Sequence, residues 1–207
     1  MTTVLSSIKE AQSESVSEGA VVVSKRPRGK AEIIESVIDA AAELFAERGP
    51  ADVSIRDIAA RAQVNHGLVH RHFATKEKVL EAVLARFDEA FKEAIEGAKD
   101  ASEAAARLAP RLREQDGFLR LIAFLLLQGA PTDSFVIPQG GLHRFITLAG
   151  SAPDASANAQ ADAVVGTALA LGWALFKPFL AEASQLDRDL IDRRVKETHR
   201  RLLSDGV

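Results

Sequence analysis

The sequence predicts an all-α protein of about nine helices, with a three-helix head near the N-terminus and a helical bundle behind it. Two observations support this fold class. Ala, Leu, Glu and Arg dominate the composition, while Tyr is absent and Trp occurs once, a balance that favours helices over sheet. Apolar residues recur at helical spacing, and no segment shows sustained period-two alternation, so no sheet is expected.

The composition also limits the class of protein. Hydrophobic residues make up 47% and charged residues 27%, as in soluble globular proteins. The longest apolar run, Leu121–Leu127, is far shorter than the roughly 20 residues that span a bilayer, and the first residues lack a signal-peptide pattern. We therefore expect a cytoplasmic protein without a membrane partner. Cysteine is absent, which excludes disulfides, thiolate metal sites and a Cys nucleophile.

Residues 1–29 are expected to form a flexible basic arm. Ser, Glu and small residues fill most of it, and its end carries the basic cluster Lys25, Arg26 and Arg28. This cluster is either a solvated linker or an arm that contacts DNA phosphates or the minor groove.

Four helices follow in residues 30–96. The first begins near Ala31 and stops at Arg48-Gly49-Pro50. Ser54 begins the second, with Asp57 as the acidic partner of a capping-box-like pair. Asn65 is the N-cap of a third short helix that runs through His72. Thr75 caps a long fourth helix, whose apolar stripe is Leu80, Leu84, Phe87, Phe91 and Ile95.

The remaining helices are predicted at about 102–115, 117–129, 139–149, 158–183 and 187–204, with Pro178 expected to bend the fourth of these. Breaks in the pattern at Pro110, Asp116-Gly117, 131–138 and 150–153 separate them. The domains are expected at 30–78 for the head and 79–207 for the body.

The two short helices of the head, joined by a tight turn, form a helix-turn-helix. The second of them has a size that a DNA major groove admits. Net charge supports a local site: the whole chain carries −3, but residues 54–78 carry five bases and two acids, which gives +3. The bases are Arg56, Arg61, Arg71, Lys76 and Lys78, and the acids are Asp57 and Glu77.

Over residues 30–85 the chain resembles the tetracycline-repressor (TetR) family. The resemblance is carried by Ser54-Ile55-Arg56-Asp57-Ile58-Ala59, Val64-Asn65-His66-Gly67, Arg71-His72-Phe73, Lys76-Glu77 and Leu80. It implies a helical homodimer that binds double-stranded operator DNA through its heads and a small-molecule effector in its variable body.

The resemblance also implies roles for single residues. Asn65, His66 and Gly67 would face base edges, and His70, Arg71, His72 and Lys76 would hold phosphates. Ser54 would cap a helix whose first amides can meet a phosphate. The chain departs from the family where Gln63 replaces a frequent Gly, His70 a frequent Tyr, and Leu68 a small polar residue. A left-handed Gln63 would carry a small strain.

Other chemistry finds little support in the sequence. His66 and His70 share a helical face, as two metal ligands can, but no carboxylate or Cys is placed to complete a site, so no metal and no cofactor is expected. A small helical enzyme or ligand carrier is the alternative to a regulator. The sequence offers no nucleophile–base pair, paired carboxylates or phosphate loop, so no catalytic residue is predicted and the protein is not expected to be an enzyme.

The body is expected to bind an effector and a second copy of the chain. Aromatic and aliphatic residues from several helices are candidates for an apolar effector cavity, although plain core packing explains each equally well: Phe87, Phe91, Phe118, Ile122, Phe145, Trp173 and Phe176. Candidates for the dimer interface form a small-residue row and an aliphatic stripe: Ala163, Gly166, Ala170, Ala174, Leu190, Ile191, Val195 and Leu202. The leading hypothesis is a homodimeric repressor released from its operator by a small, mostly apolar effector.

Overall fold

A computed structural model of the chain describes residues 29–114, 116–151 and 157–204. Within these residues every regular element is a helix. The head and the helix leading out of it are α2 (Lys30–Arg48), α3 (Ile55–Arg61), α4 (His66–Phe73) and α5 (Lys76–Ile95). The body contains α6 (Ala101–Glu114), α7 (Asp116–Leu127), the 3-10 turn η1 (Thr132–Ser134), α8 (Gly141–Ala149), α9 (Ala159–Ser184) and α10 (Arg188–Ser204). The predicted all-α class is confirmed. Lys25, Arg26 and Arg28 lie outside the described residues.

Two hydrophobic cores organise the fold. The first joins α2, α3, α4 and the first half of α5 to Leu121 and Leu125 of α7. The second joins the end of α5 to α6, α8 and α9, around Ile95, Leu108 and Phe145. The head's core therefore does not stop at residue 78, and α7 packs with the head as well as with the body.

Glycine makes the contact between α2 and α7 close. Gly49 ends α2 with φ 78°, a left-handed value that favours glycine. A Cβ at Gly49 would lie 3.0 Å from a ring carbon of Phe124, so the end of α2 packs directly on α7. A movement of α7 would therefore reach the head without an intervening layer.

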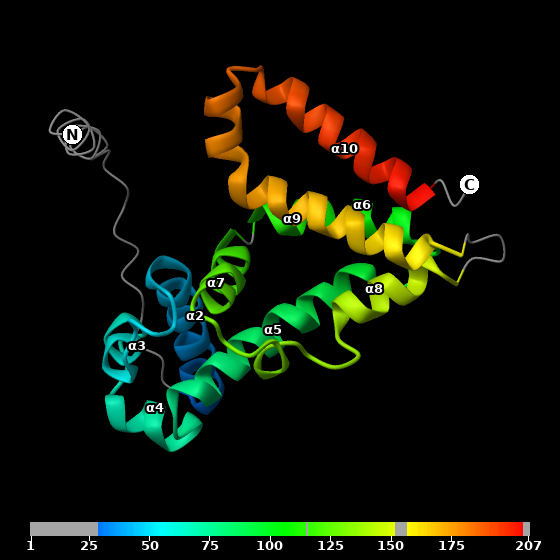
Figure 1. Ribbon diagram of the computed structural model, residues 1–207. Coiled ribbons are helices and arrows are strands. Elements are labelled where there is room, and N and C mark those ends of the chain that lie inside the picture. The colour runs from blue at the N-terminus through cyan, green and yellow to red at the C-terminus, as the bar shows by residue number, and fades with distance from the viewer. Residues whose placement is uncertain (1–28, 115, 152–156, 205–207) are drawn as a thin grey trace, which may run out of the picture.

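The helices form two groups linked by α5 (Figure 1). The head and α7 lie at one end of α5, and α8 lies beside its other end; α9 and α10 form an antiparallel pair across the top of the view. Pro178 lies inside α9, and Figure 1 shows that this helix turns in its last part, as expected where a proline removes a backbone donor.

Helix α9 is unusually apolar for its exposure. Its 26 residues include a window of mean hydropathy 1.6 of which 11% is buried. By length and composition alone this helix could cross a membrane, although a single such helix is weak evidence for that. Its exposed large apolar residues lie toward one side at helical spacing: Val164, Val165, Leu175, Phe176, Phe179 and Leu180. We call this set the α9 outer stripe.

Candidate nucleic-acid interface

The two short helices begin at well-formed caps. The Asp57 carboxylate accepts from the Ser54 backbone N–H at 2.8 Å and from the Ser54 hydroxyl at 2.6 Å. The Ser54 Oγ in turn accepts from the Asp57 N–H at 3.2 Å, which confirms the capping box. These bonds from Ser54 hold the pKa of Asp57 below its ordinary value. At α4, the Asn65 side chain accepts from the Gly67 N–H at 2.8 Å, which confirms that N-cap.

The turn between α3 and α4 has the left-handed residue that the resemblance implied. Gln63 has φ 55°, and its neighbour Val64 donates to the Ala59 carbonyl at 3.0 Å, which closes the end of α3. A non-glycine residue accepts this conformation at a small cost. The turn thus fixes how α4 leaves α3.

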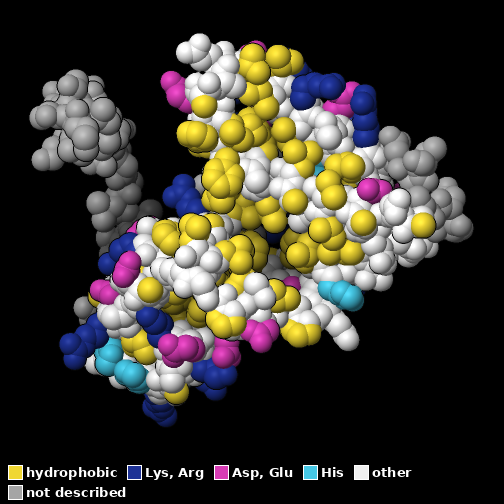
Figure 2. All heavy atoms as spheres, in the orientation of Figure 1, with side chains coloured by type: hydrophobic (Ala, Val, Ile, Leu, Met, Phe, Trp, Pro, Cys, Tyr) yellow, Lys and Arg dark blue, Asp and Glu magenta, His cyan; other side chains and the backbone are white. Residues whose placement is uncertain are grey.

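Helix α4 presents a polar outer face. Val69 is fully buried, whereas Gly67, His70 and Arg71 are exposed on the other side of the helix. The N-cap Asn65 is exposed as well, and His66, Leu68 and His72 are half-buried on the flanks. Figure 2 shows histidine side chains with Lys and Arg around them at the outer end of the head.

Two histidines of α4 contact each other. The ring centroids of His66 and His70 are 4.5 Å apart in an edge-to-face arrangement. The Nδ1 of His70 lies 3.0 Å from the Ala74 carbonyl oxygen. Ala74 has φ 62° and ψ −51°, a strained conformation for a residue with a side chain. No group of three or more His, Cys, Asp or Glu in the described part of the chain could hold a metal.

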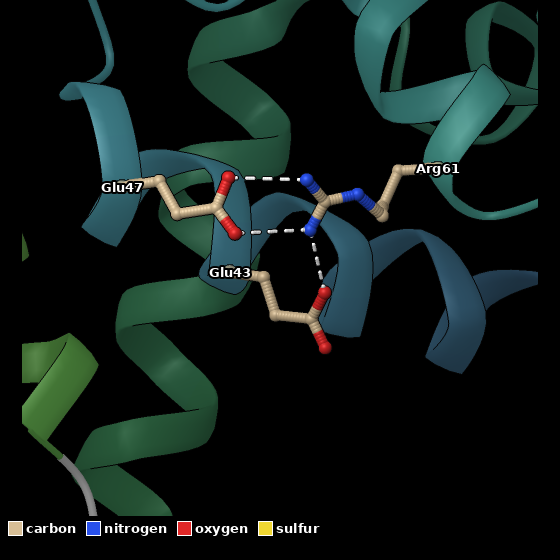
Figure 3. Close-up of polar contacts among 3 residues, drawn as sticks. All are labelled: Glu43, Glu47 and Arg61. Atoms are coloured by element: carbon tan, nitrogen blue, oxygen red, sulfur yellow. Dashed lines mark hydrogen bonds and ion pairs between the residues drawn. The ribbon is translucent and has the colours of Figure 1, made fainter. Parts of the chain in front are cut away.

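Arg61 is bound within the head itself (Figure 3). Its guanidinium donates to Glu47 at 3.0 and 3.2 Å and to Glu43 at 2.9 Å, which ties α3 to α2. The bond to Glu47, followed by that to Glu43, raises the pKa of Arg61, and the same bond lowers the pKa of Glu47. The sequence count of five bases thus overstates the free positive charge.

Lys76 also has partners inside the protein. Its ammonium donates to the Pro50 carbonyl at 2.7 Å and to the Ala51 carbonyl at 3.4 Å. These bonds join the start of α5 to the loop between α2 and α3. Lys78 pairs with Glu81 at 2.6 Å. Arg56 and Arg71 are both exposed, and no ion pair is recorded for either within the described ranges.

Comparisons with known proteins bear on this geometry. The sequence profile of the bacterial regulatory proteins of the tetR family matches residues 37–83. The HTH-type transcriptional repressor Rv3405c of Mycobacterium tuberculosis is 37% identical over 163 residues, which cover 79% of this chain and 83% of the relative. The chain belongs to the TetR family. It is a DNA-binding transcriptional regulator, of a family that binds operator DNA and is not enzymatic.

Solved structures of TetR-family regulators share the fold. One from Rhodococcus sp. matches with a TM-score of 0.61 and 20% identity, over 84% of this chain and 100% of that chain. One from Haemophilus influenzae matches with a TM-score of 0.59 and 18% identity, over 83% and 96%. At these identities the likeness shows the fold alone.

The candidate effector residues of this TetR-family chain do not all face one space. The ring centroids of Phe87 and Phe118 are 4.7 Å apart, with the rings tilted by 42°, and these rings and Ile122 pack on the first core. Phe91 and Phe145 belong to the second core. Figure 2 shows a hollow with hydrophobic side chains between these two groups of helices. Trp173 instead donates its Nε1–H to Asp192 of α10 at 2.6 Å, and Phe176 is 53% exposed on the α9 outer stripe.

The candidate dimer residues divide in a similar way. Ala163 is fully buried, and Gly166 packs on His199, whose ring carbon would lie 3.2 Å from a Cβ at this position. These two residues therefore face other helices of their own chain. Ala170, Ala174, Ile191, Val195 and Leu202 are half-buried, and Leu190 is 44% exposed. Sequence reasoning missed the α9 outer stripe because this helix is apolar on nearly every side.

Proposed function

We propose that the protein is a homodimeric, cytoplasmic repressor whose two heads read an operator and which a small, mostly apolar effector releases. The observation that best supports α4 as the recognition helix is its exposed polar face, opposite the buried Val69. Asn65, His66 and Gly67 meet base edges, and His70, Arg71 and His72 meet phosphates. Gly67 has no side chain to separate the helix backbone from the groove.

The remaining DNA contacts come from the edges of the head. The capped start of α3 at Ser54 offers backbone amides to a phosphate. The Lys76 ammonium has three N–H groups, of which its bonds to the Pro50 and Ala51 carbonyls use two. The remaining N–H donates to a phosphate. In the arm that precedes residue 30, Lys25, Arg26 and Arg28 add charge near the DNA.

The α9 outer stripe supports the dimer. Phe179 is 69% exposed and Val165 54%, so the stripe leaves large apolar groups in water. A second copy packed against it would bury them, with Leu190 and the half-buried residues of α10 at the margin of the seam. One recognition helix buries too little surface for tight operator binding, so a pair of heads is also required by the DNA.

The two cores support release by an effector. The head and α7 share one core, and α5 carries that core into the second. A ligand in the hollow between them changes the position of α7 and α5, and with them the spacing of the heads. Heads that match half-sites about 34 Å apart lose affinity when that spacing changes. The hydrophobic side chains that surround this hollow in Figure 2 favour an apolar ligand. Our candidates for its lining are residues of the two cores: Phe87, Phe91, Phe118, Ile122 and Phe145. The M. tuberculosis relative is named a repressor, which supports repression here.

Selection of DNA from a random-sequence pool tests the proposal directly. We expect a two-part, near-palindromic site that the wild type binds in a gel-shift assay and that Arg71→Gln binds more weakly. The control is Arg107→Gln, a surface arginine of the body that pairs with Glu103. Failure to enrich any sequence would contradict operator binding, and an enriched site without symmetry would contradict the dimer.

A further inference from the structure

The position of His70 fixes which of its ring nitrogens carries hydrogen. Its Nδ1 lies 3.0 Å from the Ala74 carbonyl oxygen, and a carbonyl oxygen only accepts. Nδ1 must therefore be the donor in this contact. The neutral ring then has its lone pair on Nε2, and the side chain is exposed beside Gly67 and Arg71 on the outer face of α4.

A neutral His70 of this form cannot hold a phosphate through Nε2, because both atoms are hydrogen-bond acceptors. Protonation adds a hydrogen to Nε2 while Nδ1 keeps its bond to Ala74. The imidazolium then donates to the phosphate and also attracts its charge. The alternative neutral form, with hydrogen on Nε2 only, would place the Nδ1 lone pair against the Ala74 oxygen.

The charged groups around α4 do not contact the His70 ring, so they favour neither its neutral nor its protonated form directly. On α3, Arg61 is bound by Glu43 and Glu47 of α2, and Arg56 is exposed. On α5, Lys76 is bound to the Pro50 and Ala51 carbonyls, and Lys78 pairs with Glu81. The Glu77 carboxylate is hydrogen-bonded to its own backbone N–H and to the Thr75 hydroxyl. The group that touches the His70 ring is His66, and no carboxylate bonds to His70 in the described parts of the chain.

We propose that His70 is a protonation-dependent phosphate contact, so that this protein binds its operator more tightly as the pH falls from 8 to 6. The inference rests on the proposed role of α4 as the recognition helix. Histidine is the side chain that ordinarily changes charge in this range. An aromatic hydroxyl at the same position would donate without titrating, so the dependence belongs to this chain's own residue.

The size of the effect follows from linkage. Each head takes up a fraction of a proton when its protonated His70 bonds to a phosphate, which makes binding about fivefold tighter at pH 6 than at pH 8 for each head. Because the proton is taken up on binding, the added affinity is present at low pH and is lost as the pH rises.

The test measures Kd at pH 6 and pH 8, at constant ionic strength, on DNA selected by the wild type at pH 7. We expect the wild-type ratio of the two constants to exceed that of His70→Tyr by about fivefold for each head. His143→Gln, which removes an exposed histidine of α8, should keep the wild-type ratio. Long-range proton–nitrogen spectra at pH 8 should show the His70 hydrogen on Nδ1.

The inference would be overturned by equal affinity of the wild type at both pH values, by an unchanged ratio in His70→Tyr, or by hydrogen on Nε2 at pH 8. Tighter wild-type binding at pH 8 would also overturn it, and would indicate that neutral His70 accepts from a base amino group instead. These results are distinct from failure of the proposed function, in which no DNA is selected at all.

Discussion

Asp88 of α5 caps α8 across 53 residues of sequence: its Oδ1 accepts from the Gly141 N–H at 2.7 Å. A Cβ at Gly140 would collide with the same carboxylate, so glycine allows this close approach. The helix that leaves the head is thereby joined to the body by a bond to a helix terminus, where an N–H has no partner in its own helix. Asp88 also pairs with Lys92 at 2.7 Å.

Replacing Asp88 by Ala should therefore destabilise the fold. The Gly141 N–H loses its partner at a helix start, a loss that costs about 1–2 kcal/mol in comparable caps. Urea unfolding of the purified variant measures the change. Glu89→Ala is the matched control, because Glu89 is an exposed neighbour that lies 3.7 Å from the same lysine. Equal stability of the two variants would contradict a capping role for Asp88.

Arg71 and Arg61 should differ in their effect on DNA binding, although both are arginines of the head. Arg71→Gln removes an exposed cation and should lower the salt dependence of log K by about one unit for each head. Arg61→Gln removes a cation already bound to Glu43 and Glu47, and should change the slope much less. Gel-shift titrations from 50 to 200 mM salt compare them. A larger slope change in Arg61→Gln would reverse this assignment.

Lys76→Ala should reduce both DNA affinity and stability. The sequence gives this lysine only a phosphate role, but in the structure its ammonium also holds the Pro50 and Ala51 carbonyls. We expect a loss of about 1 kcal/mol in the free energy of unfolding as well as weaker binding. Lys76→Gln keeps a donor without the charge, so it should recover part of the stability and none of the salt dependence. Recovery of both would contradict a phosphate contact.

The head could be predicted closely because its signals are local. A cap such as Asn65 acts within two residues, and the apolar stripe of one helix is enough to place its buried face, so helix order and caps follow from the sequence. Contacts between distant residues carry no such signal. Nothing near Arg61 in the sequence announces Glu43 and Glu47, and nothing near Asp88 announces Gly141.

The dimer face shows the same limit more sharply. Ala163, Gly166, Val164 and Val165 are all small or apolar, so composition alone does not indicate which side of α9 packs on α10. The structure buries Ala163 and leaves Val165 in solvent. Only the position of the neighbouring helices separates the inner row from the outer stripe.

Phe179→Glu should dissociate the proposed dimer. The ring is 69% exposed in the protomer, so the change costs the isolated fold little, but it places a charge in an apolar seam. Light scattering should give the mass of one chain for the variant and of two for the wild type. Leu127→Glu is the control, since Leu127 is 85% exposed and belongs to a different helix, α7. A wild type of one-chain mass would rule out the seam.

Trp173 joins α9 to α10 within one chain through a hydrogen bond to Asp192. Its Nε1–H donates to one oxygen of Asp192 at 2.6 Å, and Lys177 donates to the other at 2.6 Å. Burial raises the pKa of Asp192, but the bonds from Lys177 and Trp173 outweigh it, and the net pKa lies below the ordinary value. A carboxyl with a lowered pKa adds stability above its ordinary pKa of about 3.9 and loses it as the pH falls through the folded-state value.

Trp173→Phe keeps an aromatic ring and removes the donor to Asp192. We expect it to lower the free energy of unfolding by about 1–2 kcal/mol at pH 7, because a hydrogen bond to a charged acceptor is lost. The difference from the wild type should shrink at pH 3, where Asp192 is protonated in the unfolded chain and increasingly so in the fold. Urea titrations at the two pH values measure it, with Asp192→Asn as the control that removes the charge. If Trp173→Phe lowers the free energy of unfolding equally at both pH values, its effect is one of packing alone, and the bond to Asp192 does not stabilise the contact between α9 and α10.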